Sequence, residues 1–186
     1  MPYLTGLALV IGAAIGTARG GRPRFIAQRT MRTWWLVVVG FGLQVATDHL
    51  DVGGLGTALV LAGALALLVF AALNPNLVGI GVVAVGVAAN ALVIGANDGM
   101  PVRPASLIAA NVATAAQEPG LAYGRRHHRE GRSDKLEALA DIIPIAPFHQ
   151  VVSIGDLILA VGVAATIAHL FEPLPRHAAR STGGGR

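Results

Sequence analysis

Residues 55–73 read LGTALVLAGALALLVFAAL, and residues 77–96 read LVGIGVVAVGVAANALVIGA. Neither stretch contains a charged side chain, and each is close to the ~20 residues that an α-helix needs to cross the ~30 Å hydrocarbon core of a bilayer. Asn74-Pro75-Asn76 separates them, and a proline between short polar residues is typical of a tight turn. The two stretches therefore predict an antiparallel pair of membrane helices.

The composition of the whole chain also indicates a membrane protein. Of its 186 residues, 54% are hydrophobic and only 13% are charged, whereas soluble domains carry about 25% charged residues. The chain has no cysteine, which excludes disulfides and thiolate metal sites. The net charge is +4, but the basic residues cluster at the ends of apolar runs. That pattern is typical of membrane orientation, and it argues against a nucleic-acid-binding patch.

Three further apolar runs extend the prediction to an all-α integral membrane bundle of about five helices. The first run has no basic residue before it and several arginines after it, the reverse of the charge order of a signal peptide. Within this run, the spacing of Gly12 and Gly16 either permits close helix packing or reflects the abundance of glycine in the chain. The predicted membrane helices comprise residues 3–18, 33–50, 55–73, 77–96 and 151–171.

A long polar segment, residues 97–150, separates the last two predicted helices. Residues 105–117 within it are expected to form a weakly amphipathic helix that lies on the membrane or re-enters it. Pro144 and Pro147 interrupt the apolar run that follows. At the C-terminus, residues 172–186 end in a Ser-Thr-Gly-Gly-Gly-Arg sequence and are expected to be a disordered tail.

The distribution of basic residues predicts an orientation in the cell membrane. Residues 19–32 contain five arginines and the C-terminal tail contains three more, whereas residues 97–150 contain six basic residues. Charges in a long segment constrain topology less than charges in a short loop. The short loop at residues 47–54 carries two aspartates and no base. We therefore expect the N-terminus and the 97–150 segment outside, and the C-terminus in the cytoplasm.

Two aspartates are the candidate catalytic residues. Asp156 lies inside the last predicted helix, and a carboxylate costs ~2.5–3.5 kcal/mol near the centre of a bilayer. It is either a functional acid or a helix-start residue partnered by backbone donors. Asp141 precedes an Ile-Ile-Pro sequence; if it meets Asp156 at the interface, the two acids would share a proton as in an aspartyl hydrolase. An arginine such as Arg103 beside Asp156 would instead keep it ionised and make a structural ion pair.

Asn90 and Asn97 are the other candidate site residues. They are seven residues apart on one predicted helix, which is nearly two turns, so both project from the same face. Their amides either orient a substrate or form hydrogen bonds between helices, which contribute ~0.6 kcal/mol on average.

The segment 97–150 offers no metal site that its spacing would identify. His127, His128, Glu130 and Asp134 match no metal-ligand pattern, and the neighbouring arginines would repel a cation. Those arginines would attract anionic lipid headgroups instead. No cofactor motif is present in the sequence. The expected partners are the lipid bilayer and, through the glycine-rich helix faces, a second copy of the chain or another membrane protein.

Four stretches of the sequence carry a family resemblance: Leu73-Asn74-Pro75-Asn76-Leu77, residues 90–102 with their Met-Pro-Val, Asp141-Ile142-Ile143-Pro144 and Ser153-Ile154-Gly155-Asp156. In these stretches the chain resembles a family of uncharacterised bacterial multi-pass membrane proteins, defined as a domain of unknown function. The resemblance runs from about residue 20 to residue 171, and two departures are Asp98 and Ala140, where the family often has glycine. It implies a membrane location and no particular activity.

A looser comparison concerns the lipoprotein signal peptidases, small membrane aspartyl proteases to which Asp141 and Asp156 are similar in order and depth. Their Asn-x-x-Asp-Arg element is absent here, so this is an analogy. Three functions follow as hypotheses. The leading one is a structural or accessory membrane protein; the alternatives are a small interfacial aspartyl-type hydrolase acting on a lipid-linked or membrane substrate, and an oligomeric transporter.

Overall fold

Five long helices form the body of the molecule in a computed structural model, which describes residues 2–49, 55–124 and 126–173. Each begins and ends at most three residues from the range expected from its apolar run. The expected tail at residues 172–186 lies almost wholly outside the described residues. The five helices are α1 (Pro2–Ala18), α2 (Trp35–His49), α3 (Gly56–Leu73), α4 (Ile80–Asn97) and α6 (Ile154–Phe171).

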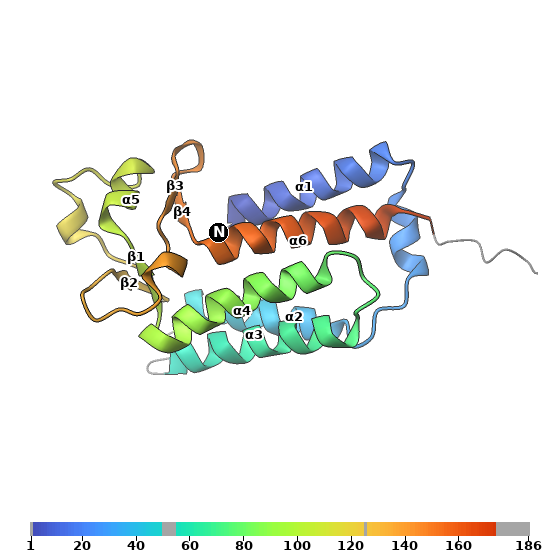
Figure 1. The fold of residues 1–186 in the computed structure, drawn as a ribbon, viewed down its shortest axis with the longest axis horizontal. Helices are drawn as coiled ribbons and strands as arrows, with labels where there is room; N and C mark the ends of the chain where they lie inside the picture. The colour runs from blue at the N-terminus through green and yellow to red at the C-terminus, as the bar shows by residue number, and fades with distance from the viewer. Residues whose placement is uncertain (1, 50–54, 125, 174–186) are drawn as a thin grey trace, which may run out of the picture.

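The helices pack side by side in the order α1, α6, α4, α3, α2, so that α6 lies between the first helix and the central hairpin (Figure 1). The hairpin of α3 and α4 turns at Asn74, whose side chain is buried. Its Nδ2 donates to the carbonyl oxygens of Phe70 and Arg32, and its Oδ1 accepts from the backbone N–H of Arg32. One side chain thus closes the turn and fastens it to the segment that precedes α2.

A small lobe at one end of the bundle contains most of residues 98–153 (Figure 1). Two parallel strands, β1 (Met100–Val102) and β2 (His127–Arg129), and two antiparallel strands, β3 (Ile143–Ile145) and β4 (Gln150–Val152), give it two small sheets. The short helix α5 (Pro104–Ala109) follows β1, and the 3-10 helices are Glu118–Gly120, Glu137–Leu139 and Ala146–Phe148.

The prediction of an all-α protein missed these strands, and the helix expected at residues 105–117 ends at Ala109. Strands of three residues are too short for an alternating pattern to appear in the sequence. The helix stops because Asn111 takes a left-handed conformation, with a φ of 56°, which asparagine tolerates better than most residues. Pro144 is accepted in β3 because that strand has one neighbour and so leaves an edge where no N–H is needed.

Three of the helices, α3, α4 and α6, are long and apolar enough to cross a membrane, and the shorter α1 is also apolar. Large apolar side chains cover the outside of the bundle as well as filling its interior. Val10, Leu65, Val85, Leu92 and Val161 are all more than half exposed. Many exposed large apolar side chains on helices of this kind are typical of a protein that contacts lipid, so the mostly helical fold is compatible with a membrane location.

Glycines let α6 approach both of its neighbours closely. A Cβ at Gly12 of α1 would lie 2.5 Å from the carbonyl oxygen of Ala164, and one at Gly16 would lie 2.6 Å from Cβ of Phe171. On the other side of α6, a Cβ at Gly86 of α4 would lie 2.6 Å from the backbone nitrogen of Leu159. The packing role considered for Gly12 and Gly16 is therefore confirmed, and the same device joins α6 to α4.

We expect Gly86→Ala to destabilise the protein by about 1–3 kcal/mol, because the obstructing atoms are backbone and cannot move aside. The matched control is Gly81→Ala on the same helix, where a Cβ would meet nothing within 4 Å. That control should be neutral or stabilising by up to ~1 kcal/mol, since alanine restricts the unfolded chain. Thermal unfolding in detergent measures both variants, and equal melting temperatures would contradict the close contact between α4 and α6.

Candidate functional site

The start of α6 is organised by Ser153 and Asp156. The Oγ of Ser153 accepts a hydrogen bond from the backbone N–H of Asp156 at 3.0 Å, and Asp156 Oδ2 accepts one from the backbone N–H of Ser153 at 2.9 Å. This reciprocal pair is a capping box, which satisfies two donors that a helix start leaves unpaired. The expected helix start at residue 151 had implied that Asp156 lies deeper in the helix. Because α6 begins at Ile154 instead, Asp156 lies in its first turn.

Asn90 of α4 completes a closed ring with these two side chains. Its Nδ2 donates to Asp156 Oδ1 at 2.6 Å, and its Oδ1 accepts from Ser153 Oγ at 2.9 Å. The neighbouring Gly155 is required for this geometry, because a Cβ there would collide with the Asn90 Oδ1 atom. Both carboxylate oxygens of Asp156 are therefore occupied by partners within the protein, and Asp156 is only 3% exposed.

Asn97 has a different role from Asn90, although the two residues are on the same helix. Its Nδ2 donates to the carbonyl oxygens of Val93 and Lys135, and its Oδ1 accepts from the backbone N–H of Lys135. These bonds fasten the lobe to the end of α4. The structure thus separates the two asparagines: Asn90 is part of the ring with Asp156, and Asn97 is not.

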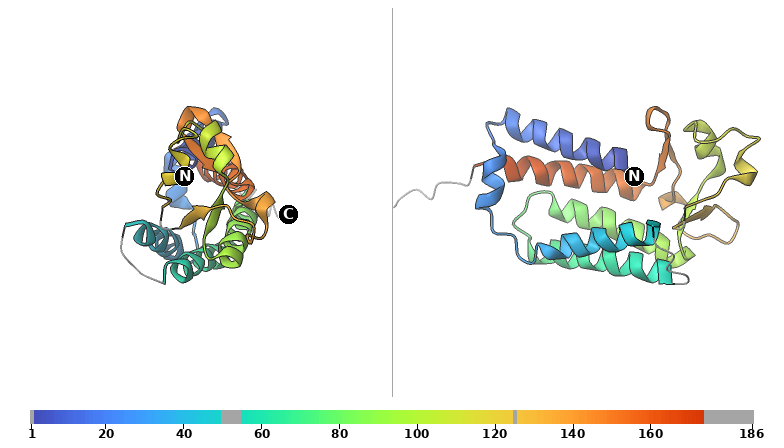
Figure 2. Two further views of the ribbon diagram at one scale, coloured as in Figure 1. Left: turned by 90° about the vertical axis from the view of Figure 1, so that its left-hand side faces the viewer. Right: turned by 180° about the vertical axis from the view of Figure 1, so that it is seen from behind.

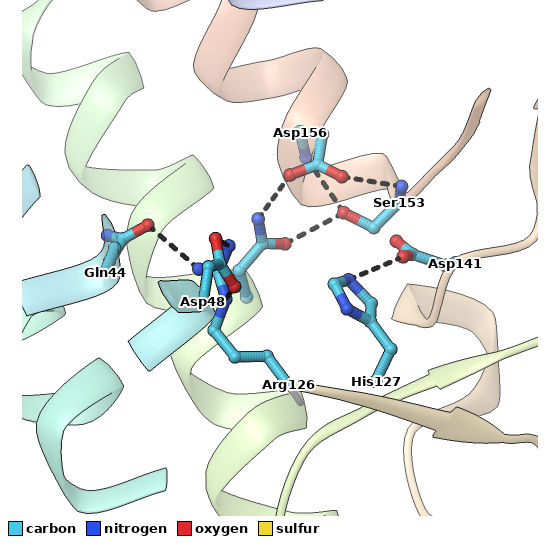
Figure 3. A network of polar contacts seen from close by, with 8 residues as sticks. Gln44, Asp48, Arg126, His127, Asp141, Ser153 and Asp156 are labelled. Carbon is cyan, nitrogen blue, oxygen red and sulfur yellow. Dashed lines mark hydrogen bonds and ion pairs between the residues drawn. The ribbon is translucent and has the colours of Figure 1, made fainter. Parts of the chain in front are cut away.

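Asp141 lies near the ring and is also buried, with 3% of its surface exposed. Its Oδ2 is 3.6 Å from His127 Nε2, beyond hydrogen-bonding distance, and its Oδ1 is buried with no hydrogen-bond partner among the described residues. Figure 3 shows its carboxyl group next to His127 and on the same side of the cluster as Ser153. Its backbone is fixed, because its N–H donates to Pro101 O and its carbonyl accepts from Arg103 N.

Both members of this pair favour their neutral forms. Burial raises the pKa of Asp141 to about 8, and the negative charge of Asp156 adds to the rise. The pKa of His127 is lowered to about 4, mainly by burial and in part by the adjacent Arg126 guanidinium. Near neutral pH the pair is therefore a protonated carboxyl group beside an uncharged imidazole, and the ionised pair is disfavoured because this location removes water from both groups.

The two candidate acids are close enough for the charge of Asp156 to affect Asp141, but they share no hydrogen bond among the described residues. The oxygens of Asp156 bind Asn90 and Ser153, and Asp141 faces His127. Arg103, the arginine considered as a partner for Asp156, makes a two-point ion pair with Glu130 instead.

A salt bridge that the sequence analysis missed connects α2 to the lobe. The Nε and Nη2 atoms of Arg126 both donate to the carboxylate of Asp48 at 2.6 Å, and Nη1 lies 3.5 Å from Gln44 Oε1 (Figure 3). The pairing joins residues that are 78 positions apart, so no local pattern reveals it. The capping box agrees with the alternative in which Asp156 is a helix-start residue partnered by backbone donors, and Ser153-Ile154-Gly155-Asp156 has the Ser-x-x-acid spacing of that motif.

Several other charged side chains of the lobe are paired with one another. His128 contacts Asp134, and Arg129 binds the buried Glu118, which also accepts from the hydroxyl of Tyr123. No group of three or more His, Asp or Glu residues placed to hold a metal occurs in the described part of the chain. The loop arginines considered for anionic lipid headgroups are in part committed, because Arg126 and Arg129 already bind carboxylates.

These features define a mostly helical protein with apolar helices able to cross a membrane, a small lobe at one end, and a buried polar cluster where the two meet. The chain belongs to DUF5317, a family of unknown function whose model matches residues 28–168. No curated protein and no solved structure matches the chain. The matched residues include Asn90, Asp141 and Asp156, and so contain the whole cluster.

The Asp141–His127 pair predicts a distinctive dependence of stability on pH. An acid whose folded pKa of about 8 exceeds its ordinary value of 3.8 holds its proton in the folded state while the unfolded chain releases it. The free energy of unfolding therefore falls as pH rises from about 4 to about 8. Asp141→Asn keeps the shape and removes this titration. The variant should have the higher melting temperature at pH 8, and its advantage should shrink toward pH 6.5.

The comparison is made between pH 6.5 and 8 to limit the contribution of His127. The pKa of His127 is about 4 in the folded protein and ordinarily 6.5, so its titration is centred at or below the lower limit of this range. Thermal unfolding of both proteins in the same detergent measures the difference. If Asp141 and His127 instead form an ionised pair, Asp141→Asn would leave a buried charge without a partner and would lower the melting temperature throughout this range.

Proposed function

We propose that this protein is a five-helix, multi-pass protein of a bacterial cytoplasmic membrane with a structural or accessory function, holding its lobe rigidly on the outer side. The observation that carries the functional proposal is the closed ring of Asn90, Ser153 and Asp156. In this ring every oxygen of the intramembrane acid is occupied by a partner inside the protein. An acid placed in this way stabilises the junction between α4, α6 and the lobe, because each of its oxygens already accepts a hydrogen bond from within the protein.

The arrangement of the two ends supports the proposed orientation. The described start of α1 and the lobe lie at the same end of the bundle, and the segment between α1 and α2 lies at the opposite end (Figure 2). That segment, residues 19–32, carries five arginines and no acid. Short basic segments remain in the cytoplasm, so the lobe is proposed to be external. α1 and α2 are about 26 and 23 Å long at 1.5 Å per residue, and they would cross with help from their flanking residues.

Single-cysteine labelling tests this topology directly, because the chain has no cysteine of its own. Ser133→Cys places a thiol on the exposed surface of the lobe, and Ala27→Cys places one on the exposed segment between α1 and α2. A membrane-impermeant maleimide should label Ser133→Cys in intact cells and Ala27→Cys only after permeabilisation. The opposite pattern at both positions would reverse the proposed orientation.

A second candidate function, acid chemistry at the membrane interface, is favoured by one observation. Asp141 presents a buried carboxyl oxygen without a partner among the described residues, next to an imidazole that is itself partly open to solvent. A buried acid that keeps its proton near neutral pH is a typical general acid. In this account Asp141 and His127, and not the two aspartates, would form the catalytic pair. Asp156 would be a positioning residue. A transporter has no comparable observation in its favour.

Asp141→Asn separates the two candidates, because asparagine keeps the shape of the side chain but cannot transfer the carboxyl proton. In a host whose own copy of the gene has been deleted, the structural proposal predicts that the Asp141→Asn variant complements the deletion as fully as the wild-type protein does. The stability measurement serves as the control, since it shows independently that the variant is folded. A variant that is folded and at least as stable as the wild type, yet fails to complement the deletion, would contradict the structural proposal and favour acid chemistry.

A further inference from the structure

A groove of about 560 Å³ runs between α1 and α6 on the outside of the bundle, away from the polar cluster. Its lining extends along α1 from Leu4 to Arg19, about 22 Å at 1.5 Å per residue. Most of this length is apolar; the larger apolar side chains are Leu4, Leu7, Ile11 and Ile15 from α1, Val161 from α6, and Val78 from the turn before α4. Val161 is 64% exposed, so a large apolar side chain forms part of the groove while remaining open to its surroundings.

The end of this groove farthest from the lobe is polar. Arg19, His169 and Glu172 line it, and Arg19 Nη1 lies 3.2 Å from Glu172 Oε1. Arg22 lies at the same end, because its backbone N–H donates to the carbonyl oxygen of Phe171 at 2.7 Å. The Arg19–Glu172 pair is open to solvent, since 63% of the arginine side chain and 31% of the glutamate side chain are exposed. Exposed pairs of this kind are weak and can be displaced by another anion.

Positive charge is in excess at this end of the bundle. Residues 19–32 contain five arginines and no acid, and among the described residues only Arg19 of these five has a carboxylate partner. Arg29 donates to the carbonyl oxygens of His169 and Glu172, which places another guanidinium beside the groove mouth without neutralising it. A long apolar groove whose polar end has more arginines than carboxylates is complementary to a molecule with an anionic head and an apolar tail.

We propose that the α1–α6 groove binds an anionic phospholipid of the surrounding bilayer, with an acyl chain along the apolar channel and the phosphate at Arg19 and Arg22. A zwitterionic lipid would bring its own cation next to the arginines and gain less. A second copy of this chain is a poorer occupant, because a two-fold dimer parallel in the membrane would bring two arginine-rich ends together. The site is independent of the structural or accessory function proposed above.

Binding is measured by native mass spectrometry of the full-length protein in detergent, titrated with phosphatidylglycerol and, separately, with phosphatidylcholine. We expect phosphatidylglycerol to bind more tightly and to be retained at higher collision energy. The double variant Arg19→Ala, Arg22→Ala should bind phosphatidylglycerol about 10- to 30-fold more weakly, the effect of losing two arginines near an anionic lipid. Its matched control is Arg132→Ala, Lys135→Ala, which removes two exposed positive charges from the lobe and should leave binding unchanged.

Two further variants keep the proposal testable if the double arginine variant does not fold. Glu172→Gln removes the carboxylate that competes for Arg19 and should raise the affinity for phosphatidylglycerol. Val161→Trp fills the groove from an exposed position and should lower the affinity while leaving every arginine in place. Equal binding of the two lipids, an equal loss in the lobe control, or unchanged binding in both Glu172→Gln and Val161→Trp would overturn the proposal.

Discussion

The hydrogen bond between Asn90 and Asp156 is the interaction on which the rest of the fold depends. A carboxylate at the start of an apolar helix needs partners that replace water, and here they come from the neighbouring helix and from its own capping residue. To reach across, Asn90 needs the backbones of α4 and α6 to be close together. Glycines at positions 86 and 155 make this possible, because a Cβ at either would strike the opposite helix. The close packing of α4 against α6 and the burial of Asp156 beside Asn90 therefore depend on each other.

The same ring determines where the lobe sits. Ser153 is at once the capping residue of α6 and the residue that follows β4, so holding Ser153 against Asn90 also holds the end of the second sheet. The Arg126–Asp48 salt bridge adds a tie between the lobe and α2, and Asn97 adds one to the end of α4. Three elements of the bundle thus hold the lobe, which is the arrangement expected for a rigid extension of the bundle.

The two ends of the bundle differ in how many of their arginines are paired with carboxylates. In the lobe, Arg103, Arg126 and Arg129 each bind a carboxylate in a two-point geometry, so these three charges are neutralised within the protein. At the opposite end the arginines of residues 19–32 exceed the available acids. Charge that is not matched internally remains available for the surroundings, and in a membrane those surroundings include lipid phosphates.

Sequence alone predicted the helices well because their signal is local: a run of about 18 apolar residues needs no knowledge of the rest of the chain. It also identified Asn90, Asp141 and Asp156, since polar side chains are conspicuous among apolar ones. It missed the strands, which are too short to show a period, and the Arg126–Asp48 pair, which joins distant positions. Asn90 and Asn97 were expected to share a helix face, but a shared face does not imply shared partners; the turn that follows Asn97 brings Lys135, not Asp156, to it.

The most direct test of the account is a double-mutant cycle between Asn90 and Asp156. It uses Asn90→Leu, Asp156→Leu and the double variant, each unfolded reversibly in the same detergent. If the ring is the central interaction, the coupling free energy should be about 1.5–3 kcal/mol, as for hydrogen bonds to a charged group. That value is well above the ~0.6 kcal/mol average for polar contacts between membrane helices. A coupling below ~0.5 kcal/mol, the level at which distant and independent sites add, would contradict the central role of the ring.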